Sequence, residues 1–414
     1  MPAGPNILWI VTTQWRAQAF GFAGDRNART PCLDALASSS WNFFQAVTPH
    51  PFGPFARAAM LTGVRSPENG VRDYYDPLPG GARTIAHELD GKGYATAFFG
   101  KWHLAGRDPA AELVGEAHAR TIVPASSRGG FAFWEGFESG FLLNDPWLHG
   151  SRLPEPVRLP GYQADVLCDR AAQWLAEREF ASPKRQPWFC VVSLEPPHPP
   201  YDAPASGVSR HQPGGVTLEL NVPRGGEVEV RARDELAGYY AHLEATDRAI
   251  GRLLAALEPL PPAAVVFTSV HGDMHGAHGL FRKGWPHEES VRVPLLVRTP
   301  GGIPRGAKQR LADAVTLADL PEITRRLAAG AVSPAPRLPP TQARISMPSV
   351  VRLPLQCDRA WTGMRTARRK LVLNSDGTPW LLFDLENDPL ELDNLAGRPD
   401  WAAEVRRLQG LEKG

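Results

Sequence analysis

Short apolar runs alternate with amphipathic stretches along most of the chain. The run Ile7–Val11 is rich in β-branched and aromatic residues and ends in polar Thr12, which is typical of a buried strand. Similar runs predict strands at Ala95–Phe99, Trp188–Leu194, Ala263–Ser269 and Val293–Arg298. The stretches between them predict helices at Pro31–Ala37, Thr84–Leu89, Gln163–Glu179, Glu235–Leu257 and Ala314–Leu327. This alternation indicates a mostly parallel sheet with helices on both faces.

Polar residues follow three of these strands directly. Lys101 and His103 come after the strand at 95–99, His198 after the strand at 188–194, and His271 after the strand at 263–269. The carboxyl ends of parallel strands meet at one edge of an open sheet, where ligands bind. The sequence therefore predicts a functional site at this edge.

The last part of the chain has a different pattern. A Pro-rich segment, Val332–Pro340, predicts a linker, and the apolar runs Lys370–Leu373 and Trp380–Phe383 predict strands before a terminal helix. We therefore expect a three-layer α/β domain over residues 1–340 and a small C-terminal α+β domain over residues 341–414. Segments 109–160 and 203–231 look irregular, and the second predicts an insertion or flap near the site.

Composition excludes several classes of partner for this chain of 414 residues. Its 45 basic and 44 acidic residues give a net charge of +1, so no overall field favours nucleic acid. No apolar run reaches the roughly 18 residues of a membrane helix, and no basic leader precedes the first strand. Four scattered cysteines without a CxxC pair read as reduced thiols, so we expect a cytoplasmic protein. The sequence makes no prediction of the oligomeric state.

Several motifs occur in an order that points to a known family. They are Asn6–Thr12, Arg57–Gly63, Gly100–His103, Pro197–Tyr201, His271–Met274, His278–Leu280 and Lys283-Gly284, followed by Arg365-Thr366, Lys370 and Leu382–Pro389. Together they resemble the type I sulfatases of the alkaline-phosphatase-like superfamily. The resemblance covers nearly the whole chain and implies the fold of that family.

The resemblance also implies a nucleophile that this chain lacks. The family uses a Cys or Ser, converted to formylglycine, four residues before the motif arginine. That arginine matches Arg57, so the nucleophile position is Gly53, and Phe55 replaces the motif proline. No Cys or Ser lies between His50 and Arg57. Glycine has no side chain to oxidise or to attack with.

The family also holds a divalent cation, usually Ca²⁺, with hard oxygen ligands. Its Asp followed by Asp or Gln match Thr13 and Gln14, and its Asp followed by Asn or His match Val270 and His271. Without carboxylates, this set does not offset the dehydration of Ca²⁺ or Mg²⁺. We therefore expect no metal and no cofactor.

The side chains that contact the anion in the family are all present. They match Arg57, Lys101, His103, His198 and Lys283. Like charges gathered without a metal or carboxylates repel one another unless an anion lies among them. We therefore expect Arg57, Lys101, His198 and Lys283 to bind an anionic small molecule. His103, His198, Lys101 and His271 are the candidate catalytic groups.

Other interpretations of these residues stay open. Lys101 and Lys283 are also compatible with solvated lysines, and the histidines with packing or turn roles. His271, His275 and His278 could hold Zn²⁺, although their Gly-rich setting favours a loop. His50 could approach the site as a new base. Without a metal or base, the hydroxyls of Thr12 and Thr13 stay weak nucleophiles.

Three functions from different classes follow. The first is a repurposed metal-independent enzyme that uses acid–base steps, such as elimination, isomerisation or ring closure in secondary metabolism, on an anionic small molecule. The second is a non-catalytic anion-binding protein or scaffold. The third is a sulfuric or phosphoric ester hydrolase with an atypical site.

Overall fold

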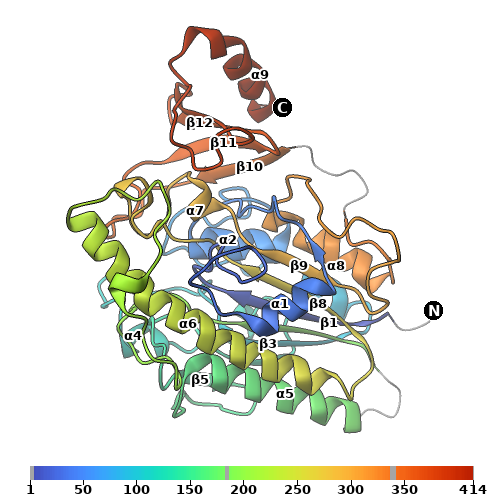
Figure 1. The fold of residues 1–414 in the computed structure, drawn as a ribbon. Helices are drawn as coiled ribbons and strands as arrows, with labels where there is room; N and C mark the ends of the chain where they lie inside the picture. Colours follow the sequence, from blue (N-terminus) through green and yellow to red (C-terminus); the bar gives the residue numbers. More distant parts are fainter. Residues whose placement is uncertain (1–3, 182–185, 336–341, 414) are drawn as a thin grey trace.

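The computed structural model describes residues 4–181, 186–335 and 342–413 (Figure 1). Nine strands form the large sheet in the order β2-β9-β8-β1-β7-β3-β4-β5-β6. The strands are β1 (Asn6–Thr12), β2 (Trp41–Asn42), β3 (Ala95–Lys101), β4 (Phe133–Phe137), β5 (Trp147–Gly150), β6 (Val157–Arg158), β7 (Trp188–Ser193), β8 (Ala263–Ser269) and β9 (Leu295–Arg298). The central strands β8, β1, β7, β3 and β4 run parallel, and β2, β5, β6 and β9 pair antiparallel.

Helices cover both faces of this sheet (Figure 1). The side chains of β1 alternate between two cores, as a strand buried on both faces requires. Leu8 and Ile10 pack with α1 (Pro31–Ser38), α5 (Gln163–Ala181) and α6 (Glu227–Leu257). Ile7, Trp9 and Val11 face the opposite way, toward α2 (Gly53–Thr62), α3 (Ile85–Asp90) and α8 (Leu320–Ala328). The short helices α4 (Glu116–Ala119) and α7 (Glu288–Val291) lie in connecting segments.

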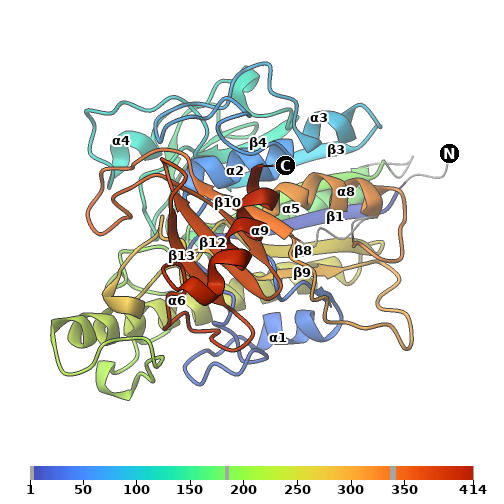
Figure 2. The same cartoon turned by 90° about the horizontal axis from the view of Figure 1, so that it is seen from above.

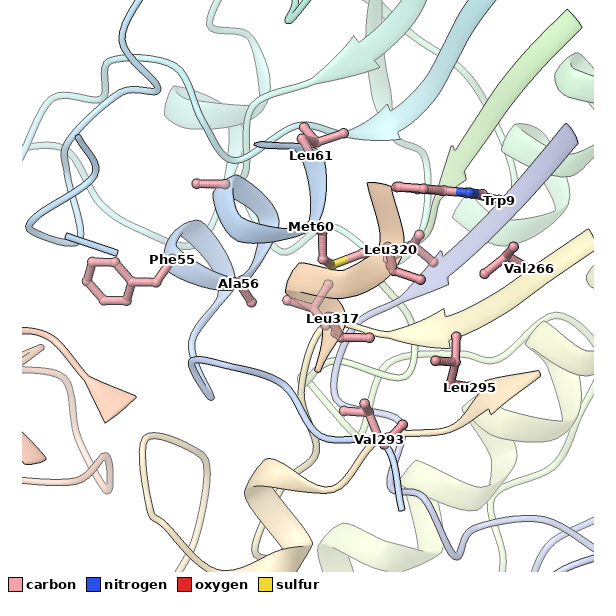
Figure 3. Packing of buried hydrophobic residues seen from close by; sticks show 14 of the residues in the cluster. Trp9, Phe55, Ala56, Met60, Leu61, Val266, Val293, Leu295, Leu317 and Leu320 are labelled. Atoms are coloured by element: carbon pink, nitrogen blue, oxygen red, sulfur yellow. The ribbon is translucent and has the colours of Figure 1, made fainter. Parts of the chain in front are cut away.

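A close view shows how α2 is held against the sheet (Figure 3). Met60 and Ala56 of α2 lie beside Leu317 and Leu320, and Trp9 and Val266 of the sheet lie behind them (Figure 3). All six side chains are buried. This packing fixes α2 relative to the strand ends, which matters because α2 carries Gly53 and Arg57.

The C-terminal part forms a second sheet at the edge of the molecule (Figures 1 and 2). Strands β10 (Gln342–Met347), β11 (Trp361–Thr366), β12 (Arg369–Asn374) and β13 (Pro379–Asp384) pair antiparallel in chain order. Helix α9 (Ala402–Lys413) packs its Leu408 against Met364, Leu371 and Leu382. None of the helices in the described ranges is long and apolar enough to cross a membrane.

The fold class predicted from the sequence is confirmed, with local differences. Strands β4 and β5 lie in segment 109–160, which was expected to be irregular, and β10 and β11 were not predicted. Helix α6 begins at Glu227, inside the predicted insertion. A 3-10 turn at Leu317–Asp319 precedes α8 where one longer helix was expected. The predicted domain boundary and most of the predicted linker lie outside the described residues.

Candidate active site

The predicted site residues come together at the carboxyl edge of the large sheet. Gln14 follows β1, Lys101 ends β3, His198 follows β7 and His271 follows β8, while α2 supplies Arg57. All five side chains are buried, as are His103 and Lys283. The functional roles of these residues remain predictions. Their contacts, described below, limit the chemistry that the site allows.

Gln14 lies at the centre of one hydrogen-bond network. Its backbone has a φ of 68°, which turns the side chain into the site. The amide nitrogen donates to Asp273 and, at 3.2 Å, to the Tyr201 hydroxyl, which itself donates to Asp273 at 2.6 Å. Burial alone would raise the pKa of Asp273, but the nearby His275 and Arg282 hold that pKa well below its usual range. Asp273 is therefore an anion inside the site.

Lys283 joins this network to His198. Its ammonium donates to Gln14 Oε1 at 2.6 Å and lies 3.0 Å from His198 Nε2. His198 Nδ1 lies 2.7 Å from the carbonyl oxygen of Pro199, so Nδ1 carries the proton and Nε2 accepts. Burial, reinforced by the neighbouring Lys101 ammonium, lowers the pKa of Lys283 to about 7. Burial and these two ammonium groups also hold the pKa of His198 well below its usual value.

Lys101 has a buried counter-ion, Glu195. The ammonium and Glu195 Oε1 are 2.5 Å apart, and the same ammonium lies 4.4 Å from the centre of the Phe141 ring. The Phe141 ring in turn stacks on His198 with centroids 4.5 Å apart. Burial lowers the pKa of Lys101 to about 8, although the negative charge of Glu195 acts to raise it. The expectation that only a bound anion could neutralise these cations is therefore wrong, because Glu195 and Asp273 supply negative charge.

Arg57 forms hydrogen bonds to residues at or directly after the carboxyl ends of strands β1, β3 and β7. One Nη atom donates to Ser193 Oγ at 2.6 Å and to the carbonyl oxygen of Lys101 at 3.2 Å, and the other donates to Thr13 Oγ1 at 3.0 Å. Its Nε is buried and has no partner among the described residues. Three of the five N–H groups thus hold the site together, and the Nε–H and one N–H of the Nη atom bound to Thr13 are left for a ligand.

His103 lies where a side chain of residue 53 would begin. A Cβ added to Gly53 would be 2.7 Å from His103 Nδ1. His103 Nε2 lies 2.5 Å from Nη1 of Arg107, which is 3.4 Å from Glu138 through its Nε. A guanidinium can only donate, so Nε2 is the acceptor and Nδ1 carries the proton. Burial and the cation of Arg107 hold the pKa of His103 well below its usual value.

The four positions that hold the cation in the family do not form a calcium site here. Thr13 Oγ1 donates to the Leu194 carbonyl oxygen and accepts from Arg57, and Gln14 Oε1 accepts from Lys283. Val270 offers no ligand atom. His271 Nε2 alone among them is buried without a partner in the described part of the chain. A hard cation takes six to eight oxygen ligands, which this set does not supply.

The two histidine alternatives are not supported by the contacts. His275 packs against Tyr239 at 4.4 Å between ring centroids, and His278 stacks on His287 at 4.5 Å. The described residues hold one group with metal-ligand spacing, His278 with Glu289 and Glu391, and it does not include His271. His50 uses both ring nitrogens in hydrogen bonds, to Ser346 and to the backbone of Ser66.

Sequence reasoning missed Glu195, Phe141 and Tyr201 as parts of the site. Glu195 stands directly after the strand at 188–194 and three residues before His198, which is a signal that could have been used. Phe141 comes from segment 109–160 and has a φ of 55°, so no local pattern places its ring between Lys101 and His198.

The mostly parallel sheet flanked by helices, with its small C-terminal antiparallel sheet, is the fold seen in sulfatase structures. The family model described as Sulfatase matches residues 5–321, and the chain belongs to this family. It is 37% identical, over 72% of its length, to the ulvan-active sulfatase of Formosa agariphila, and it spans 57% of that relative's length. It is 29% identical to the choline-sulfatase of Rhizobium meliloti, covering 95% of this chain and 83% of the relative.

Solved structures agree with the fold. A protein of glycosaminoglycan metabolism from Bacteroides thetaiotaomicron superposes with a TM-score of 0.84 at 22% identity, covering 99% of this chain and 96% of the other. The phosphonate monoester hydrolase of Agrobacterium radiobacter gives a TM-score of 0.74 at 22% identity, covering 99% and 94%. At these identities the likeness concerns the fold alone.

Proposed function

We propose that this member of the sulfatase family is a metal-independent enzyme that binds an anionic small molecule and transfers a proton to or from it. The observation that carries the proposal is the 3.0 Å contact between the Lys283 ammonium and His198 Nε2. Both side chains are almost fully buried, so a proton can pass between two groups that are shielded from bulk water.

The charges around this pair suit acid–base work. With a pKa of about 7, Lys283 is present in both protonation states near neutral pH, which favours a general acid or base. Lys101 keeps two further N–H donors after its bond to Glu195, and these can hold an anionic group. His271 Nε2, which has no partner in the described structure, can accept a proton from a substrate hydroxyl.

The relatives support an anionic ligand, because they include an ulvan-active sulfatase and a choline-sulfatase. Gly53 offers no atom for a covalent ester intermediate at the family position. We therefore expect steps that need proton transfer without a bond to residue 53, such as elimination, isomerisation or ring closure. One acid–base pair of this kind contributes about 10²–10⁴-fold to a rate.

The test is turnover of a panel of anionic esters and acids, followed with and without EDTA. We expect turnover that resists EDTA and falls at least 100-fold in Lys283→Met. The control variant Lys92→Met removes an exposed lysine and should leave turnover unchanged. EDTA-sensitive cleavage of aryl sulfates or phosphates would instead identify an ester hydrolase with an atypical metal site. Anion binding without turnover across the panel would identify a non-catalytic anion-binding protein. Either result overturns the proposal.

A further inference from the structure

A cluster of buried acceptor atoms is formed by residues that the candidate active site does not use. His278 from the turn after β8, Glu289 of α7 and Glu391 from the segment after β13 each bring one ligand atom within 4.8 Å of the others. The two glutamates are each 3% exposed, and the histidine is half-buried. These segments lie far apart in the sequence, so the tertiary fold gathers the three side chains.

Asn221 adds an amide group to this cluster. Its Nδ2 donates to Glu289 Oε1 at 2.6 Å, and lies 3.2 Å from His278 Nε2 and 3.4 Å from the carbonyl oxygen of Leu390. An amide nitrogen carries two hydrogens, so three acceptors compete for two N–H groups. Because an amide nitrogen only donates, His278 Nε2 is an acceptor and presents a lone pair to the cluster.

Two buried oxygen atoms of the cluster are left without a partner. Glu289 Oε2 and Asn221 Oδ1 accept no hydrogen bond from the residues that the structure describes. Glu289 also forms no ion pair within the described ranges, whereas the buried ammonium of Lys370 lies 2.5 Å from Glu391. A buried carboxylate without a counter-ion is costly, so Glu289 calls for a cation.

The ligand atoms indicate which cation fits. One imidazole nitrogen and two carboxylate oxygens suit Zn²⁺, whereas Ca²⁺ and Mg²⁺ need more oxygen ligands. In a tetrahedral zinc site, neighbouring ligand atoms lie roughly 3.3 Å apart. The 3.2 Å between His278 Nε2 and the amide nitrogen of Asn221 is close to this spacing. Turning the amide end for end therefore places Oδ1 at the position of a fourth ligand.

We propose that His278, Glu289, Glu391 and Asn221 form a structural Zn²⁺ site. The ion ties the turn after β8 and α7 to the C-terminal part of the chain. Lys283 lies five residues after His278, so the same ion steadies the segment that carries Lys283. None of the four ligands is a candidate catalytic group or one of the family's cation positions, so this inference does not depend on the proposed function.

The experiment is calorimetric titration of the full chain with ZnCl₂ after dialysis against EDTA. We expect one Zn²⁺ per chain, and a melting temperature higher by about 3 °C when free Zn²⁺ is 100 times its Kd. Glu289→Gln and His278→Asn should each weaken binding at least about 100-fold. Asparagine suits position 278 because the φ of that residue is 55°. Glu289→Gln keeps an acceptor for Asn221, so without metal it should melt no earlier than the metal-free wild type.

The matched control is His211→Gln, which removes a part-exposed histidine stacked on Tyr240 and should bind Zn²⁺ like the wild type. Failure of the wild type to bind Zn²⁺, or unchanged binding in both ligand variants, overturns the site. Loss of binding in His271→Gln alone would place the ion in the candidate active site. Equal affinity for CaCl₂ or MgCl₂ would show that the cluster is not a zinc site. Either of these results also overturns the proposal.

EDTA in the turnover assay would remove this ion as well. Turnover is therefore compared with and without EDTA in Glu289→Gln, which has no ion at this site to lose. Sensitivity to EDTA in the wild type but not in the variant supports the zinc site and leaves the proposed function standing. Sensitivity in both indicates a metal in the active site, which contradicts the proposed function alone.

Discussion

Lys283 takes a position that explains how the site exists without family carboxylates. Its ammonium binds Gln14 Oε1, one of the oxygens that the family resemblance assigns to the divalent cation. The same ammonium contacts His198, and the amide nitrogen of Gln14 donates a hydrogen bond to Asp273. The Lys283 ammonium therefore links Gln14, from the positions assigned to the cation, to His198, from the positions assigned to the anion.

The lowered pKa of Lys283 predicts a pH dependence of stability. The group titrates at about 7 in the fold and at about 10.4 when unfolded, so between these values the unfolded chain binds more protons. The free energy of unfolding should therefore rise with pH from about 7 to about 10.4. The stability gained from neutral Lys283 is lost again as the pH falls through this window to 7. Between pH 7 and pH 10, the free energy of unfolding measured with urea should rise by roughly 3–4 kcal/mol more in the wild type than in Lys283→Met.

The control for this titration is Lys92→Met, which removes an exposed lysine and should keep the wild-type slope. An unchanged slope in Lys283→Met would show that another group titrates in this window.

The sequence predicted the cations of the site but not their partners. Lys101 and His198 follow strands and sit in motifs, so both could be recognised without a structure. The contacts of Lys101 with Glu195 and Phe141 join segments about 94 and 40 residues apart in the chain, and no local period relates such positions. The predicted cations lie together, but the sequence analysis did not predict Arg107 beside His103 or Glu195 beside Lys101.

Helix α2 shows how one element positions several site groups. It presents Gly53 at its start and Arg57 one turn later, while Met60 and Ala56 pack against Leu317 and Leu320 (Figure 3). The helix ends at Gly63, whose φ of 74° lets the chain turn away after a hydrogen bond to the Ala59 carbonyl oxygen. Both ends of the element therefore depend on glycine, for different reasons.

Two glycine-to-alanine substitutions in helices should have opposite effects on stability. Gly63→Ala adds a Cβ in ordinary contact with Pro321 but forces alanine into the left-handed region, so we expect a loss of about 1 kcal/mol. Gly410→Ala lies inside α9 with no atom within 4 Å of the new Cβ, so we expect a gain of about 0.5–1 kcal/mol.

Thermal or urea unfolding of the two variants measures the contrast. Equal shifts in both would mean that backbone conformation at Gly63 is not what stabilises the end of α2.

Burial explains which elements could be predicted. Strands β1, β7 and β8 are apolar except at their ends because helices cover both faces. Strand β4 has Glu135 at its centre, where Arg152 and Arg170 neutralise it from outside the strand, so its sequence resembles a loop. The sequence does not reveal that β9 runs antiparallel to its neighbours, because side chains alternate with a period of two in parallel and antiparallel strands alike.

The two sheets are joined by a buried ionic network. Glu288 of α7 binds Arg365 of β11 at 2.9 Å and Lys370 of β12 at 3.2 Å, and Lys370 also binds Glu391 at 2.5 Å. Nearby, the backbone nitrogen of Lys283 donates to Gln356 Oε1 at 3.1 Å. The C-terminal part therefore contacts the segment that carries Lys283 as well as forming a separate sheet.

Removing one partner from this network should destabilise the whole molecule. Glu288→Gln leaves the buried Arg365 without a carboxylate and Lys370 with Glu391 alone, and we expect a loss of about 3 kcal/mol. The same change at Glu404, which pairs with the half-exposed Arg407, should cost less than about 1 kcal/mol. Chemical denaturation of both variants compares them directly, and a similar small loss in each would show that the network does not hold the two sheets together.

The central position of β1 has a consequence for biosynthesis. This strand leaves the ribosome well before its neighbours β7 and β8, which begin only at Trp188 and Ala263. At about 5–20 residues per second, the nascent strand waits on the order of ten seconds or longer for its second neighbour. During translation its apolar side chains need shielding by chaperones or by transient collapse, and the candidate site can assemble only after Lys283 has been synthesised.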